Sequence, residues 1–194
     1  MNHPSSPSIR GLVYASMLGA ATAAGAYIIV PLPPVPITLQ TLFMALAAVL
    51  LGARLGALSQ VVYVLLGLIG LPVFAGGKAG FGVLLGPTGG YLVGFVAGAF
   101  ITGFLVDRMN RPGALRIAFA VAVGYLVVYV PGVIQLSLVA KISLVKAFSL
   151  GALPFLIGDA LKTAAIAIVV PKIRDRVRIG HTAGKSLPGK RMQA

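Results

Sequence analysis

The chain has 194 residues, of which 58% are hydrophobic and only 10% charged. That balance excludes a soluble globular domain and predicts one integral membrane domain of about six spans, since each helix needs roughly 20 residues to cross about 30 Å of hydrocarbon. The net charge of +13 does not indicate nucleic-acid binding, because the basic residues cluster at the ends of apolar runs, and the lack of cysteine excludes disulfides and thiolate chemistry.

Six apolar runs, broken by Gly, Pro or charge, predict an all-α bundle of six transmembrane helices. They cover residues 11–30, 37–51, 55–71, 88–106, 115–138 and 151–170. The short second and third runs are separated only by Gly52-Ala53-Arg54, which predicts a tight helical hairpin. In the fifth run, Pro131-Gly132 predicts a kink or a break.

The first predicted helix carries small residues at four-residue spacing. They form two neighbouring rows, Ala15, Gly19 and Ala23, and Ser16, Ala20 and Ala24. Such a strip lets another helix approach closely. The pattern fits internal packing as well as it fits docking of another subunit.

A Gly-rich connection over residues 72–87 follows the third predicted helix. It is too apolar for a solvated loop and too rich in Gly and Pro for a helix. Backbone of this kind is tolerated near a membrane only where it packs on protein or lines a cavity. We therefore expect it to fold back over the outer end of the bundle, between helices three and four, as a re-entrant segment or a lid.

Lys and Arg residues lie mainly on alternate connections. With the N-terminus inside, twelve of them fall on one side and three on the other, Lys78, Lys141 and Lys146. The positive-inside rule then places both termini in the cytoplasm. We expect a cytoplasmic tail over 1–10, a transmembrane domain over 11–171 and a basic cytoplasmic tail over 172–194.

The last predicted helix holds Asp159 and Lys162, which a spacing of three places on one helix face. Burying ions in hydrocarbon costs several kcal/mol each by most estimates, so they are expected to face the bundle interior. Two interpretations stay open. The pair neutralises itself and fixes packing, or Asp159 accepts N–H bonds from a polar ligand while Lys162 meets an acceptor oxygen.

Other chemistries have few residues to work with. Proton relay and intramembrane catalysis are disfavoured, because the chain lacks Glu and Asp107 and Asp175 lie among cytoplasmic arginines. His3 and His181 lie in opposite tails, which disfavours a metal site. Residues 180–186 resemble a phosphate-binding loop but have one residue too few between the glycines. We expect no cofactor and no metal.

Aromatic and amide residues near the outer face would complete a pocket. They are Gln40, Phe43, Tyr63, Phe74, Phe81, Tyr91, Tyr129 and Gln135. Aromatic belts explain several of them equally well. The two glutamines are more informative, because an amide in an apolar helix needs a partner, either another helix or a ligand.

Four motifs resemble the BioY family. They are VPLPPVPITLQT at 30–41, GLIGLPVFAGG at 67–77, GPTGGYLVGF at 86–95 and GDALK at 158–162. The resemblance runs from about residue 10 to residue 171, so it covers all six predicted helices in order. Members of this family are the biotin-specific substrate-binding (S) components of energy-coupling factor (ECF) transporters.

The resemblance implies a multi-pass protein of a prokaryotic cytoplasmic membrane that binds biotin near its outer side and is not an enzyme. Its partners would be an ECF transmembrane coupling subunit and a pair of ABC ATPases. The alternative is a self-sufficient, oligomeric facilitator or secondary transporter of a small anionic solute.

The resemblance also implies roles for individual residues. Asp159 and Lys162 would contact the polar groups of biotin, Lys78 would suit its valerate carboxylate, and Tyr91 would follow a turn that lines the site. The expected biotin contacts are Asp159, Lys162, Tyr91, Lys78, Thr88, Gly89, Gly90 and Gln40. The strip on the first helix resembles the face that docks on the coupling subunit, formed here by Ala15, Gly19, Ala23, Ser16 and Ala20.

Overall fold

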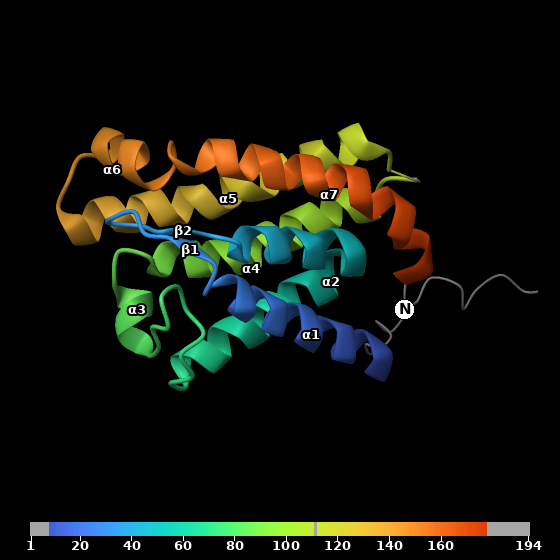
Figure 1. Ribbon diagram of the computed structural model, residues 1–194, viewed down its shortest axis with the longest axis horizontal. Coiled ribbons are helices and arrows are strands. Elements are labelled where there is room, and N and C mark those ends of the chain that lie inside the picture. Colours follow the sequence, from blue (N-terminus) through green and yellow to red (C-terminus); the bar gives the residue numbers. More distant parts are fainter. Residues whose placement is uncertain (1–7, 111, 178–194) are drawn as a thin grey trace, which may run out of the picture.

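The computed structural model describes residues 8–110 and 112–177, and side chains as far as 172. Long helices run side by side along the molecule, and short elements gather at one end (Figure 1). The long helices are α1 (Ile9–Gly25), α2 (Gln40–Leu68), α4 (Gly89–Asp107), α5 (Ala114–Ala140) and α7 (Phe155–Val177). The short elements are β1 (Ile29–Val30), β2 (Ile37–Thr38), α3 (Phe81–Leu85) and α6 (Leu144–Gly151).

Within the described residues, three helices are long and apolar enough to cross a membrane, namely α2, α4 and α5. A fourth span results if α6 and α7, which meet at 47°, are one broken helix. The protein is therefore mostly helical with three to four apolar spans. The predicted count of six helices across the membrane remains a prediction.

The first helix ends at Gly25, five residues before the predicted end at Val30. Residues 29–30 instead pair with residues 37–38 in an antiparallel hairpin, with Ile29 opposite Thr38. Two physical reasons account for this. The β-branched run 28–30 favours extended backbone, and the four prolines that follow lack the amide that a helix needs. The all-α expectation was wrong in this hairpin.

Helix α2 reverses direction at Gly52, where φ is 80° and ψ is −174°. A Cβ atom on Gly56 would lie 2.7 Å from Cα of Ala48, whereas eight residues of continuous helix span about 12 Å. The two halves of α2 therefore pack against each other, as the predicted hairpin requires. Oδ2 of Asp107 accepts the Ala53 N–H at 2.9 Å and so caps the second half.

The C-terminal third differs in detail from the predicted helices. Helix α5 continues through Pro131, so of the predicted kink or break the break is ruled out. Residues 139–150, between the fifth and sixth predicted helices, contain α6, whose cap residue Ser143 accepts the Lys146 N–H at 3.3 Å. Helix α7 begins only at Phe155, because residues 152–154 interrupt the helix. Asp159 thus lies in the second turn of α7, closer to its start than predicted.

The Gly-rich segment is irregular except for an isolated antiparallel bridge between Phe74 and Lys78 and for α3, a helical turn that the sequence did not predict. It is fixed at both ends. The buried ring of Phe74 packs on Gly67 so closely that a Cβ there would lie 2.1 Å from Cζ. Nε2 of Gln135 donates to the carbonyl oxygens of Leu84 and Gly86 at 2.7 and 2.8 Å. Gln135 therefore has its partner within the protein.

Candidate functional site

A partly open cavity lies among the hairpin, the Gly-rich segment and the ends of the long helices. Its wall comes from segments that are far apart in the sequence. The lining residues are Val35, Pro36, Thr38, Gln40, Thr41, Phe74, Ala75, Lys78, Val83, Thr88, Tyr91, Leu92, Phe95, Val128, Tyr129, Phe155, Asp159 and Lys162. The wall is mostly apolar and aromatic, with its charged groups on α7 and at Lys78.

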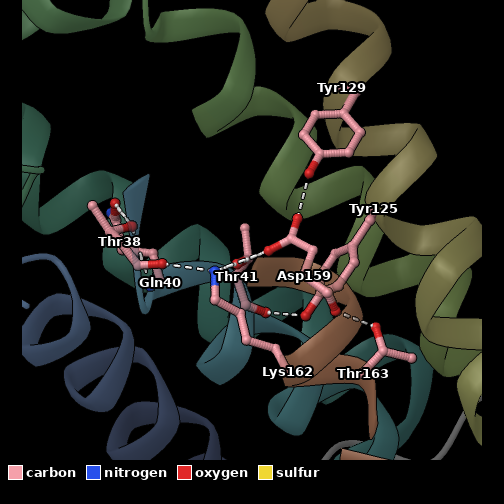
Figure 2. A network of polar contacts seen from close by, with 8 residues as sticks. All are labelled: Thr38, Gln40, Thr41, Tyr125, Tyr129, Asp159, Lys162 and Thr163. Carbon is pink, nitrogen blue, oxygen red and sulfur yellow. Dashed lines mark hydrogen bonds and ion pairs between the residues drawn. The ribbon is translucent and has the colours of Figure 1, made fainter. Parts of the chain in front are cut away.

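Asp159 and Lys162 share one face of α7 and form an ion pair, as Figure 2 shows. Nζ of Lys162 lies 2.9 Å from Oδ1 of Asp159, and the two residues are 9% and 4% exposed. The expectation that both side chains face the interior is confirmed. A pair this deeply buried stabilises a fold only if its remaining donors and acceptors are satisfied.

The ammonium group of Lys162 is fully engaged. Besides Asp159, it donates to the carbonyl oxygen of Thr38 and to Oγ1 of Thr41, each at 2.8 Å. An ammonium has three protons, so these three acceptors use all of its donors. Lys162 thereby joins α7 to β2 and to the first turn of α2.

The carboxylate of Asp159 is engaged unevenly. Oδ1 accepts from Lys162 and from the Thr41 hydroxyl, the latter at 3.0 Å. Among the described residues, Oδ2 accepts only from the Tyr129 hydroxyl (Figure 2). Because a carboxylate offers about four acceptor positions, Oδ2 keeps capacity for a further donor. The ion pair is thus stabilised by protein contacts, and Asp159, which lines the cavity, keeps capacity for one further donor.

Four other expected site residues line the cavity in different ways. Gln40 is buried, and its amide donates to the Tyr63 hydroxyl. The Tyr91 hydroxyl donates to a main-chain oxygen, so its ring is the part available to a ligand. Thr88 lies in the wall, and Lys78 lines it from an otherwise exposed position.

Gly89 and Gly90 were expected to contact the ligand, but they are not among the residues that line the cavity. A Cβ on Gly89 would lie 1.7 Å from the Leu84 carbonyl oxygen, and one on Gly90 would lie 2.2 Å from that of Pro131. These glycines let the start of α4 pack directly on the backbone of α5 and on the end of α3. Their place in the structure is therefore in helix packing.

The small-residue strip on α1 divides between two environments. Ala15 is buried, and a Cβ on Gly19 would lie 2.8 Å from the Ser59 carbonyl oxygen, so this row packs on α2. The expectation that Ala15 and Gly19 dock a partner was wrong, because α2 covers them. Ala23 is half-buried, whereas Ser16 and Ala20 are exposed.

Sequence reasoning missed several residues of the site. These are Thr38, Thr41, Tyr125 and Phe155. Isolated hydroxyls in an apolar helix are common and carry no periodic signal. One signal was available, since Tyr125 and Tyr129 lie four apart, which places both on the same face of α5.

A bundle of apolar helices with a buried ion pair at the wall of a mostly apolar cavity defines a membrane-type binding protein for a small polar molecule. Its sequence narrows the class further. The BioY family profile matches residues 1–179, and the chain belongs to that family.

The chain is similar to the biotin transporter BioY of Thermotoga maritima, with 42% identity over 166 residues, covering 86% of this chain and 96% of that protein. A probable biotin transporter BioY of Pyrococcus horikoshii is 39% identical over 155 residues, covering 80% and 90% of the two chains. Among solved structures, the S-component for biotin from an ECF-type ABC transporter matches with a TM-score of 0.78 and 29% identity, covering 86% and 92%.

Proposed function

We propose that this protein is a membrane-embedded, high-affinity biotin-binding subunit that mediates biotin uptake, a transport protein and not an enzyme. The observation that carries the proposal is the remaining acceptor capacity of the Asp159 carboxylate, which belongs to a buried ion pair at the wall of a mostly apolar cavity. Biotin has ureido N–H donors at one end, a carboxylate at the other and apolar parts between. Such a cavity, with few polar groups, suits it.

The proposed arrangement places the ureido ring at α7. There, Oδ2 of Asp159 accepts an N–H, and Lys162 reaches the ureido oxygen only by exchanging one of its present acceptors. The apolar part of the ligand packs on the rings of Tyr91 and Phe155 and on Thr88 and Gln40. At the cavity rim, Lys78 meets the valerate carboxylate.

We further propose six membrane crossings, formed by α1, the two halves of α2, α4, α5 and α7, within the cytoplasmic membrane of a prokaryote. Both ends of the domain 11–171 would face the cytoplasm, with the Gly-rich segment over the outer end of the cavity. This topology is supported by the start of α1, the end of α7 and the α4–α5 connection, which share one end of the bundle (Figure 1). The tails 1–10 and 172–194 extend beyond the described residues.

The proposed partners are an ECF coupling subunit and ABC ATPases, because the similar solved structure is the biotin S-component of an ECF-type ABC transporter. On α1, the exposed residues Ser16 and Ala20 form the proposed docking row.

Uptake of labelled biotin tests the function in bacterial cells that lack their own biotin transporter, with and without these partners. Accumulation that requires the partners supports the proposal. Accumulation by the chain alone favours the self-sufficient transporter, and none in either case contradicts both.

A further inference from the structure

We infer that Thr41 is a positioning residue of the ligand site, whose hydroxyl orients Asp159 and Lys162 so that Oδ2 of the carboxylate is the acceptor presented to the ligand. The inference rests on the proposed function, since it concerns the same cavity. Thr41 is the second residue of α2, and it contacts both ions from outside their own helix.

The hydroxyl of Thr41 is a bridge between the two ions. It accepts from Nζ of Lys162 at 2.8 Å and donates to Oδ1 of Asp159 at 3.0 Å. A hydroxyl has one proton, so its single donor is directed at the carboxylate. Together with the direct ion pair, this bridge occupies Oδ1 twice.

The position of Thr41 is itself fixed. Its carbonyl oxygen accepts from the Tyr125 hydroxyl at 3.3 Å, which ties the first turn of α2 to α5 (Figure 2). Lys162 is also held by the carbonyl oxygen of Thr38 in the hairpin. The Thr41 hydroxyl therefore reaches the ion pair from a segment of backbone that contacts with α5 and α7 hold in place.

Removal of the hydroxyl has two consequences at the site. One proton of Lys162 loses its acceptor, and Oδ1 of Asp159 loses a donor. The carboxylate is then free to turn Oδ1 toward the cavity, where the Lys162 ammonium, with one donor left without an acceptor, competes with a ligand N–H for the carboxylate. Hydrogen bonds to charged groups contribute enough that we expect an affinity loss of about 10-fold or more.

Three variants test this in detergent-purified protein, with biotin affinity measured by competition binding and folding by thermal midpoint. Thr41→Val removes the hydroxyl at nearly constant volume, and Thr41→Ser keeps it. Thr102→Val is the matched control, because Thr102 is fully buried on α4 and its hydroxyl has no partner in the described part of the chain. We expect biotin affinity to fall in Thr41→Val alone, and the affinity of Thr41→Ser to stay within about 3-fold of that of wild type.

A double-mutant cycle separates positioning from a general packing role. If Thr41 acts through the carboxylate, Thr41→Val changes affinity by less than about 3-fold when Asp159 is already Asn. An equal loss in both backgrounds overturns the inference, as does a Thr41→Ser variant as weak as Thr41→Val. If wild-type protein binds no biotin, the proposed function fails. If wild type binds and Thr41→Val matches Thr102→Val, only the role of Thr41 fails.

Discussion

The hydroxyl of Tyr91 donates to the carbonyl oxygen of Gly151 over 2.7 Å and occupies the space that a side chain at position 151 would need. A Cβ on Gly151 would lie 2.3 Å from that hydroxyl oxygen. The contact joins α4 to the end of α6, directly beside the cavity. This geometry assigns the hydroxyl a structural role and leaves the ring for the ligand.

Tyr91→Phe is therefore expected to lower stability by about 1 kcal/mol, the usual net value of one hydrogen bond, and to change biotin affinity by less than about 3-fold. Gly151→Ala is expected to destabilise the protein more, through its clash with the hydroxyl. The Tyr91→Phe/Gly151→Ala double variant should recover part of that loss. Thermal midpoints and biotin titrations measure these effects. A large affinity loss in Tyr91→Phe would assign the hydroxyl to the ligand instead.

Lys78 at the cavity rim is expected to act on the carboxylate end of the ligand. Lys78→Ala should weaken biotin binding by about 3- to 10-fold, as expected for a partly exposed charge pair, and leave the affinity for biotin methyl ester unchanged. Lys146→Ala is the control, since Lys146 is exposed on α6 and does not line the cavity. Equal losses for acid and ester in Lys78→Ala would show that Lys78 does not meet the carboxylate.

The reversal of α2 depends on a glycine at position 52. Gly52→Ala forces a side chain into a backbone conformation that only glycine adopts readily, and its Cβ would lie 2.6 Å from both carboxylate oxygens of Asp107. We expect a loss of roughly 2–4 kcal/mol, seen as a lower thermal midpoint and folded yield. Gly70→Ala is the matched control, because φ there is 105° but an added Cβ would lie within 4 Å of no described residue other than its chain neighbours. Equal effects would mean that the contact with Asp107 is unimportant.

The two faces of α1 are expected to respond differently to substitution. Gly19→Leu should prevent proper folding, because Gly19 packs on the backbone of Ser59. Ala20→Leu lies on the exposed face and should leave biotin binding unchanged while reducing partner-dependent uptake. Binding assays on purified protein and uptake assays on cells with the partner subunits measure the two effects. Normal uptake by Ala20→Leu would remove this face from the proposed docking site.

The sequence was informative where the free-energy cost of burying a residue depends only on that residue and its near neighbours in the chain. A carboxylate and an ammonium within an apolar run must be paired wherever the run packs, so the inward orientation of Asp159 and Lys162 followed from spacing and charge. The reversal at Gly52 followed likewise from short apolar runs on both sides of Gly-Ala-Arg.

The remaining features depend on tertiary contacts. The bridge from Thr41 to Asp159 joins residues 118 positions apart, and no pattern in either segment specifies it. Ala15 and Ser16 are adjacent small residues on α1, yet only the packing of α2 decides that one is buried and the other exposed. The hairpin at residues 29–38 was missed because an apolar run of β-branched residues fits a buried helix as well as a strand.

Calorimetric titration of biotin into detergent-purified protein tests the ion pair as the ligand site, with Asp159→Asn and Lys162→Met beside wild type and Thr102→Val as the control. We predict tight binding by wild type and Thr102→Val, and losses of about 100-fold or more in Asp159→Asn and Lys162→Met, because each change leaves a buried partner unpaired. Wild-type binding weaker than micromolar, or normal binding by both site variants, would contradict the assignment of the ion pair as the biotin site.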